Sequence, residues 1–520
     1  MDVIYIVGPS ILIAVVLAAV FLDRWSVPII LIALGAGICF GSDVLGLWHF
    51  DDIGLTNQVA NLALVFILFY GGFSTKRSAF REVALPAGGL ATWGVLLTAA
   101  VTFGVLYGFL NWDFEKAILL AVIVSSTDAA AIFSILRRQS LTKKLSSTVE
   151  IESAANDPMA ILLTMAVVEA LTVGHAPLPM MALDFLWQFG TAPLLGWLVA
   201  RGSVALFNRL KPQDRGHYYI LTLAIVLLIF GLAQLLGSSG MLAVFVAGFV
   251  MGNRSFVHKQ GVYNFSSALS TIANVGLFVL LGLQVFPSEW AGIWKEGILL
   301  FLVLTFVARP VAVWLSTLGM RMGWRHQLFT SWAGLRGAVP IVLATYPMAA
   351  GIPAGDDIFN LVFFAVLLSV AIQGGSLGPL ARWLKCTVPA RPNPLFNLEL
   401  VTMAASDLDL IVVDLPGPQD SVGPSIAELN LPIGSVITLI TRGQDLVIPK
   451  GSTRLHGWDQ VSVLANANEE EKIRSLFIDT FAVDSPDEGT QHVDSHEKSS
   501  KSKAILPVPA TAKNQSETKD

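Results

Sequence analysis

The sequence predicts an all-α polytopic membrane protein with about 13 transmembrane helices, followed by a small cytoplasmic α/β domain. Of its 520 residues, 54% are hydrophobic and only 14% are charged, and the mean hydropathy is +0.66. Apolar runs of about 17 to 25 residues, the length that spans a bilayer, repeat as far as residue 384. After Pro394 the pattern changes to short alternating runs typical of strands. This composition excludes a water-soluble globule.

Thirteen apolar runs supply the predicted spans. They cover residues 3–22, 27–47, 56–73, 85–110, 114–136, 146–172, 182–208, 217–236, 238–252, 263–285, 297–318, 327–349 and 356–384. Only Asp2 precedes the first run, which therefore lacks the basic leader of a cleaved signal peptide and is expected to remain as a span.

Basic residues are distributed unequally over the loops between these spans. Nineteen Lys and Arg residues fall on one set of alternating loops, whereas the other set holds Lys116 and Lys295. Lys and Arg collect on the cytoplasmic side of membrane proteins. The loop charges therefore predict an N-terminus outside and a C-terminus in the cytoplasm. We expect an integral protein of the bacterial inner membrane.

The C-terminal part divides into two regions. Alternating runs such as LDLIVVDL and SVITLITR, followed by the helix-forming NEEEKIRSLF, predict an α/β domain. The polar residues beyond it predict a disordered tail. The expected domains are a transmembrane domain at 1–390, a small cytoplasmic domain at 396–481 and a tail at 484–520. A nucleotide ligand of the small domain stays open, although no Gly-rich phosphate loop follows a strand. We expect no cofactor and no nucleic-acid partner.

Ionisable residues occur inside four of the predicted spans. A carboxylate near the bilayer centre costs about 2.5 to 3.5 kcal/mol on insertion scales, so it needs a partner or a function. Counting about 1.5 Å per residue places Asp128, Asp157, Arg309 and Arg336 near the middle of a core about 30 Å thick. A purely structural role, in which an intramembrane Asp pairs with an Arg to hold helices together, stays open for Asp128.

Spacing sorts the polar residues of the sixth span onto neighbouring faces. Glu152 and Asn156 are four residues apart and share one face, and Ser153 and Asp157 share the next. We expect Glu152 to form a structural ion pair with Arg309. This pairing leaves Asp157 as the titratable carboxylate.

The fifth and twelfth spans are predicted to be interrupted near the midplane. The run Ser125-Ser126-Thr127-Asp128 consists of poor helix formers whose side chains compete for backbone groups. In the twelfth span, Gly334, Gly337 and Pro340 surround Arg336. Broken helices in two spans of opposite direction are typical of transporters built on inverted repeats.

Taken together, these residues resemble a known family. The segments SSTDAAAIFSIL, ESAANDPMA, FVARP and GLRGAVPIVLATYP resemble the NhaP-type cation/proton antiporters over about residues 1–385, closest to their potassium/proton branch. The resemblance implies an ion- and proton-binding Asp157 with Asn156 beside it and Ser153 as a further ligand. It also implies an unwound crossing helix at Thr127 and Asp128, a buried Glu152–Arg309 ion pair and a second crossing helix at Arg336.

The resemblance also implies a homodimer in which a six-helix core moves against a dimerisation domain. Residues 398–465, including the hairpin-like VIPKGSTRLHGWDQVSVLA, are similar to the TrkA-C regulatory domain. This domain is expected either to bind a small-molecule ligand or to serve dimerisation or trafficking. The chain has Tyr70 where many relatives carry an acidic residue, and Ser126 and Ala129 where many sodium-type members have prolines.

The predicted function is secondary active exchange of a monovalent cation, potassium in the first place, for protons by alternating access at a midplane aspartate. The partners are then potassium or sodium, protons and membrane lipid, with no resident metal and no enzymatic activity. Sodium/proton exchange is the alternative, because oxygen ligands suit both cations. A ligand-gated cation channel is a more distant alternative, since it would need a filter of stacked carbonyls that the sequence lacks.

Overall fold

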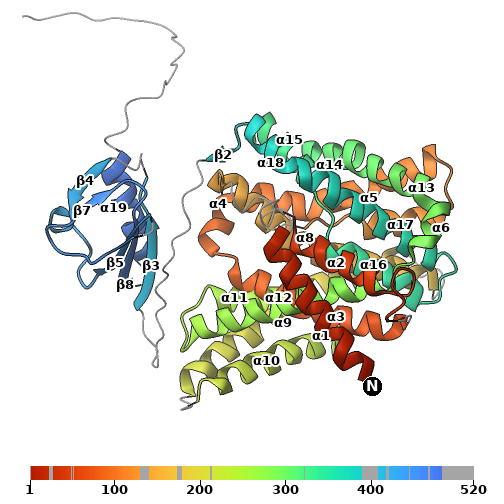
Figure 1. Ribbon diagram of the computed structural model, residues 1–520, viewed down its shortest axis with the longest axis horizontal. Helices are drawn as coiled ribbons and strands as arrows, with labels where there is room; N and C mark the ends of the chain where they lie inside the picture. The colour runs from red at the N-terminus through yellow and green to blue at the C-terminus, as the bar shows by residue number, and fades with distance from the viewer. Residues whose placement is uncertain are drawn as a thin grey trace, which may run out of the picture.

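The computed structural model describes most of the chain as a helical bundle and a small strand-containing domain (Figure 1). The described residues are 2–22, 27–48, 50, 52–128, 140–172, 178–210, 214–320, 322–388, 408–416, 421–443, 445–466 and 469–482. The tail predicted at 484–520 lies outside them, as does the second half of the predicted fifth span.

The helical bundle belongs to an integral membrane protein. Nine helices within the described ranges are long and apolar enough to cross a membrane. They cover Tyr5–Leu22, Ile53–Ser74, Phe80–Phe109, Lys144–Thr172, Leu183–Arg209, Gly216–Leu235, Lys259–Leu283, Trp290–Ser316 and Gly355–Trp383. Three shorter apolar helices join them, at Ile29–Phe40, Gly240–Gly252 and Ala338–Ala349. The polytopic helical class is thus confirmed, whereas thirteen spans stays a prediction.

Several long spans are divided into consecutive helical elements. In chain order the helices are α1 (Asp2–Leu22), α2 (Ile29–Phe40), α3 (Ile53–Ser74), α4 (Arg77–Gly89), α5 (Val95–Phe103), α6 (Phe114–Ile123), α8 (Lys143–Thr172), α9 (Leu178–Arg209), α10 (Gly216–Leu235), α11 (Gly240–Gly252), α12 (Lys259–Leu283), α13 (Trp290–Val303), α14 (Arg309–Ser316), α15 (Trp324–Trp332), α16 (Ala338–Ala349), α17 (Gly355–Leu368) and α18 (Gly375–Trp383). Single π-helical turns at Leu90–Gly94, Gly104–Phe109, Leu304–Ala308 and Ser369–Gly374 separate some of them. Such turns keep the span continuous while rotating its faces, so they leave no break in an apolar run.

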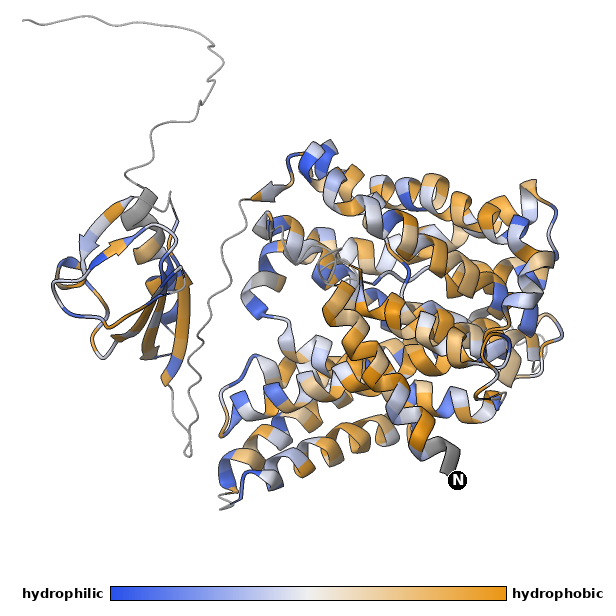
Figure 2. Cartoon of the chain, in the orientation of Figure 1, coloured by the Kyte–Doolittle hydropathy of each residue, from blue (hydrophilic) through white to orange (hydrophobic). Residues whose placement is uncertain are grey.

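The helices pack in two groups. Helix α11 packs against α3 and α9, and α12 packs against α2 and α3. In the other group α4 packs against α8, α8 against α6, and α13 and α16 against α17. Apolar residues cover most of the bundle, as expected for helices that face lipid (Figure 2). The polar residues described below lie inside it.

The C-terminal domain is a small antiparallel structure with its own core. Its elements are β3 (Leu408–Asp414), β4 (Val422–Ser425), β5 (Val436–Arg442), β6 (Asp445–Val447), β7 (Arg454–His456), β8 (Gln460–Asn466) and α19 (Glu470–Ala482). One sheet has the order β3-β8-β5-β6, and β4 pairs with β7. Buried Ile440, Val461 and Phe477 belong to a hydrophobic cluster separate from that of the helical bundle. The predicted strand-containing domain is present.

The hairpin-like segment from β6 to β8 does not form a hairpin. Strand β8 pairs with β3 and β5, and β7 pairs with β4. The apolar side chains of Val461, Val463 and Ala465 are fully buried in the domain core, which requires a central position for β8. Tertiary burial therefore outweighs the local turn signal in this segment.

Candidate functional site

The break in the fifth span lies where its polar residues predict it. Helix α6 ends at Ile123, and Ser126 to Asp128 have no helical structure. The Ser125 hydroxyl donates to the Val122 carbonyl at 2.6 Å. A side chain thus satisfies a backbone group that a continuing helix would have used, which favours termination at this point.

The break in the twelfth span depends on glycine. Helix α15 ends at Trp332 and α16 begins at Ala338. A Cβ atom on Gly334 would lie 2.5 Å from Arg309 Nε, and one on Gly337 would lie 1.8 Å from Asp128 Oδ2. No side chain fits at either position without displacing a charged group, so both glycines permit close approach.

The two breaks are joined directly to one another. The backbone N–H of Asp128 donates to the Leu335 carbonyl at 2.8 Å. The Arg336 guanidinium donates through Nη1 to the carbonyls of Ser125 and Ser126. These carbonyls stand at the C-terminal end of α6, where the helix dipole is negative, so the positive Arg336 stabilises the exposed helix end.

Helix α8 contacts the broken fifth span through two polar side chains. Asn156 Nδ2 donates to Thr127 Oγ1 at 2.7 Å, and the Thr127 N–H donates to Asn156 Oδ1 at 3.4 Å. The Ser153 hydroxyl donates to the Thr127 carbonyl at 2.7 Å. The unwound segment is therefore held against α8 at Thr127.

Asp157 follows Asn156 on the same helix, and its carboxylate has an oxygen that can still bind a ligand. Its Oδ1 is buried and accepts no hydrogen bond from any residue that the structure describes. Its charge interacts with that of Asp128 on the broken fifth span. A buried carboxylate oxygen without a donor costs free energy unless a proton or a cation binds it.

Glu152 and Arg309 form an ion pair inside the bundle, through Glu152 Oε1 and Arg309 Nη2. Their side chains are only 2% and 4% exposed, respectively. Paired buried charges cancel, so neither adds net charge near Asp157. Arg309 opens α14 directly after the π-helical turn Leu304–Ala308, which orients it toward α8.

The sequence reasoning missed the polar residues that support the second break. The Arg336 N–H donates to Ser369 Oγ at 3.2 Å, and the Ser369 hydroxyl donates to Gln373 Oε1 at 2.6 Å. Gln373 Nε2 then donates to the Trp332 carbonyl at 3.1 Å. This chain links both ends of the break to α17 and its π-helical turn. The i, i+4 spacing of Ser369 and Gln373 in an apolar span was the available signal.

A second polar group lies between α3, α12 and α16, and the sequence reasoning missed it as well. Asn57 Nδ2 donates to Thr345 Oγ1 at 2.9 Å, and the Tyr346 hydroxyl donates to Asn61 Oδ1. Tyr70, farther along α3, lies within hydrogen-bond distance of the Tyr263 hydroxyl, at 3.2 Å. Tyr70 is therefore part of a tyrosine pair that joins α3 and α12.

Comparison with known proteins gives concordant results. The family described as "Sodium/hydrogen exchanger, transmembrane" matches residues 11–383. The K(+)/H(+) antiporter NhaP2 of Shewanella sp. (strain ANA-3) is 37% identical over 91% of this chain and 83% of its own length. The K(+)/H(+) antiporter NhaP of Alkalimonas amylolytica is 32% identical over 91% of this chain and 83% of its own length.

A solved structure shares the fold. The sodium proton antiporter MjNhaP1 from Methanocaldococcus jannaschii at pH 8 superposes with a TM-score of 0.66 at 23% identity, covering 74% of this chain and 99% of its own.

Proposed function

Since the chain belongs to the sodium/hydrogen exchanger family, we propose that it is a secondary active antiporter that exchanges potassium for protons at Asp157. The observation that carries this proposal is the buried Asp157 Oδ1, which lacks a hydrogen-bond donor among the described residues. It stands on α8 beside the point where two broken helices meet. A transported ion needs such a ligand, because a carboxylate whose oxygens all accept hydrogen bonds has no oxygen left to bind the ion.

The chemistry is competition for one carboxylate. A proton neutralises the carboxylate and a bound cation balances its charge, and the two exclude one another because they occupy the same oxygens. If the loaded site opens to one side of the membrane at a time, this exclusion makes the exchange obligatory. Neither substrate crosses unless the other returns.

The neighbouring residues have distinct roles in this proposal. Oxygen atoms of Thr127 and Ser153 complete the ligand set for a hard cation, together with water. Asn156 fixes the unwound segment and adds no charge. Arg336 neutralises the end of α6, and Asp128 contributes negative charge that attracts the cation.

The cation is assigned to potassium on sequence likeness. The two relatives described above carry potassium in their names, and each matches 91% of this chain. Sodium is the second candidate, supported by the family's description. One proton per cation is the simplest stoichiometry, because Asn156 stands where a second acid would add charge and Glu152 is neutralised by Arg309. Exchange is then electroneutral.

The assembly and the placement in the cell are part of the proposal. The chain forms a homodimer in a bacterial inner membrane, with the N-terminus outside and the C-terminus in the cytoplasm, and it serves cation and pH homeostasis. Residues 396–481 form a TrkA-C-like regulatory domain. The unequal distribution of Lys and Arg over the loops supports this orientation.

The experiment that tests the assignment uses acid-loaded inverted vesicles and a pH-sensitive dye. Potassium salts are expected to collapse the proton gradient at lower concentration than sodium salts, with no effect of an imposed membrane potential. A preference for sodium would reassign the cation and leave the site unchanged. No response to either cation would contradict antiport.

The regulatory assignment has its own test. A chain that lacks residues 396–520 is expected to change the rate or the pH dependence of exchange in the same vesicles. If both were unchanged, the domain would instead serve dimerisation or trafficking.

A further inference from the structure

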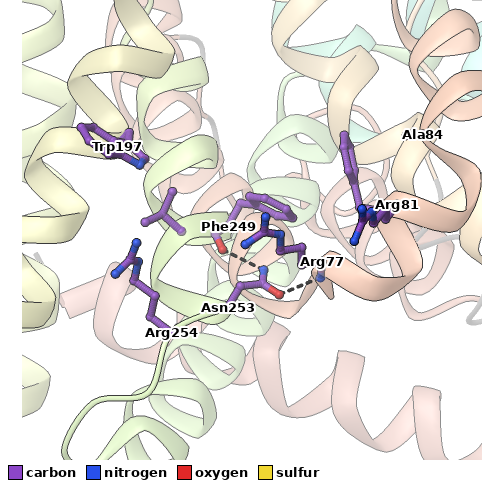
Figure 3. A pocket seen from close by; sticks show the side chains of 9 residues that line it. Arg77, Arg81, Ala84, Trp197, Phe249, Asn253 and Arg254 are labelled. Carbon is purple, nitrogen blue, oxygen red and sulfur yellow. Dashed lines mark hydrogen bonds between the residues drawn. The ribbon is translucent and has the colours of Figure 1, made fainter. Parts of the chain in front are cut away.

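A cavity of about 560 Å³ lies between α4, α9 and α11 (Figure 3). Arg77 and Arg81 of α4 line one side, and Arg254, two residues after α11, lines the other. Trp197 of α9 and Phe249 of α11 form aromatic walls. The cavity lies at the end of the bundle where α4 begins, and the distribution of basic loops predicts that this end is cytoplasmic. Its residues are far from Asp157 in the sequence and have no part in the antiport mechanism.

The N–H donors of the three arginine side chains are available to a ligand. All three side chains are exposed, and none makes an ion pair or a side-chain hydrogen bond within the described ranges of the chain. No acidic residue lines the cavity among those described. A solvated basic surface needs no cavity and no aromatic wall, so solvent exposure alone does not account for this arrangement.

The backbone around the cavity is fixed. Asn253 Oδ1 accepts from the Arg77 N–H at 2.6 Å, and Asn253 Nδ2 donates to the Thr75 and Phe249 carbonyls at 2.8 Å each (Figure 3). The side chain of Asn253 thus joins the end of α11 to the start of α4. The backbone of Arg77 and that of Arg254, which follows Asn253, are thereby held at a set separation.

We propose that this cavity binds a phosphate group, in the first place that of an anionic lipid in the cytoplasmic leaflet. A guanidinium binds two oxygens of a phosphate at once, and several guanidinium groups can share one phosphate because its oxygens point in different directions. A single carboxylate offers only two oxygens and is satisfied by one arginine. Basic pockets between transmembrane helices on the cytoplasmic side bind lipid head groups by this chemistry.

The aromatic walls favour a lipid over a free anion. Trp197 is 40% exposed on α9, where Arg201 stacks over its ring at 4.9 Å. Amphipathic Trp side chains and basic residues of this kind mark the level of the lipid head groups. An acyl chain can lie along Trp197 while its phosphate reaches the arginines.

Binding is expected to stabilise the protein. Helix α4 packs against α8, whereas α11 packs against α3 and α9. A phosphate between Arg77 and Arg254 therefore adds a connection between the two helix groups, beside the contact of Asn253 and the hydrogen bonds between α3 and α16. A ligand that binds only the folded state raises the melting temperature.

The test is thermal unfolding of the purified full chain in detergent, followed by tryptophan fluorescence. Phosphatidylglycerol is added to one sample and the zwitterionic phosphatidylcholine to another, with inorganic phosphate and pyrophosphate as soluble alternatives. Phosphatidylglycerol is expected to raise the melting temperature by several degrees and phosphatidylcholine to leave it unchanged. If the soluble anions produce the shift instead, the phosphate site stands and its source is soluble.

The matched variants remove equal charge. R77Q/R81Q/R254Q is expected to lose the shift, whereas R209Q/R325Q/R382Q, which changes three exposed arginines outside the cavity, is expected to keep it. The single substitution Arg254→Gln, after the end of α11, serves if the triple variant does not fold, and it should reduce the shift by at least half. Equal shifts in all variants, or no shift with any phosphate in the unmodified chain, would overturn the proposal. These readouts do not involve transport, so they are independent of the antiport assignment.

Discussion

Asn156 on α8 binds Thr127 of the broken fifth span through both ends of its carboxamide. Its Nδ2 donates to Thr127 Oγ1 at 2.7 Å, and its Oδ1 accepts from the Thr127 N–H at 3.4 Å. One side chain therefore fixes both the position and the side-chain rotamer of the unwound segment. The next residue along α8 is Asp157, so the same contact sets the distance between the carboxylate and the carbonyls of the break.

Replacing Asn156 by Ala is expected to lower exchange activity at least tenfold. The substitution removes both hydrogen bonds and leaves the buried Thr127 groups unsatisfied, at a cost of about 1 to 3 kcal/mol in stability. Dye-based exchange and thermal unfolding measure the two effects. Thr164→Val is the matched control, because Thr164 is buried on the same helix and its hydroxyl has no partner among the described residues. Unchanged exchange in the Asn156 variant would show that the contact is dispensable.

Replacing Glu152 by Gln is expected to destabilise the protein by about 3 to 5 kcal/mol, because Arg309 keeps a buried charge without its partner. The melting temperature of the purified protein measures this loss. The double variant Glu152→Gln/Arg309→Met removes both charges and should be more stable than the single variant. A single variant with the same melting temperature as the unmodified protein would contradict a structural role for the pair.

Replacing Gly337 by Ala is expected to abolish exchange. The new Cβ would stand 1.8 Å from Asp128 Oδ2, so either the carboxylate or the break must move. Gly276→Ala on α12 is the control, since a Cβ at that position meets nothing within 4 Å. Both variants are compared in the vesicle assay at equal expression. Full activity of the Gly337 variant would mean that the breaks do not need this close approach.

The C-terminal domain contains an ion pair of its own, in which the carboxylate is buried and the guanidinium is partly exposed. Asp459 is fully buried and accepts from Arg442 Nε and Nη2 at 2.9 and 2.8 Å, and from the His456 N–H at 2.8 Å. These bonds raise the pKa of the Arg442 guanidinium above its usual value. Because a raised pKa contributes stability that disappears only when the pH rises through it, the contribution of Arg442 is complete at neutral and mildly alkaline pH.

Asp459→Asn is therefore expected to increase cleavage of the domain by added protease, to a similar extent at about pH 7 and about pH 9. Asp445→Asn, an exposed aspartate in β6 of the same sheet, is the control. If the protease cleaved both variants at the same rate, the ion pair would contribute little to the stability of the domain.

The two helix breaks could be predicted because their causes are local. The Ser125 hydroxyl binds a backbone carbonyl at the end of α6, and Gly334 and Gly337 permit close approach. Both signals lie in a few consecutive residues. The pairing of Glu152 with Arg309 was predictable from charge, since an acid and a base inside the membrane cancel one another's charge.

Other contacts could not be predicted because they depend on packing between distant spans. Nothing in the sequence near Arg336 indicates that its guanidinium binds the carbonyls of Ser125 and Ser126, 210 or more residues away. Ser369 and Gln373 were overlooked because they stand in a long apolar run. The π-helical turns were invisible for the same reason, since an apolar run has the same composition with or without one.

The most direct test of the central claim compares the unmodified chain with Asp157→Asn in acid-loaded inverted vesicles. Asparagine keeps the size of the side chain but takes up no proton and carries no negative charge to balance that of a cation. The unmodified chain is expected to release protons when potassium is added, and the variant is expected to release none above the background of vesicles without the protein. An Asp157→Asn variant that exchanges potassium for protons at the unmodified rate would contradict the assignment of the ion site to Asp157.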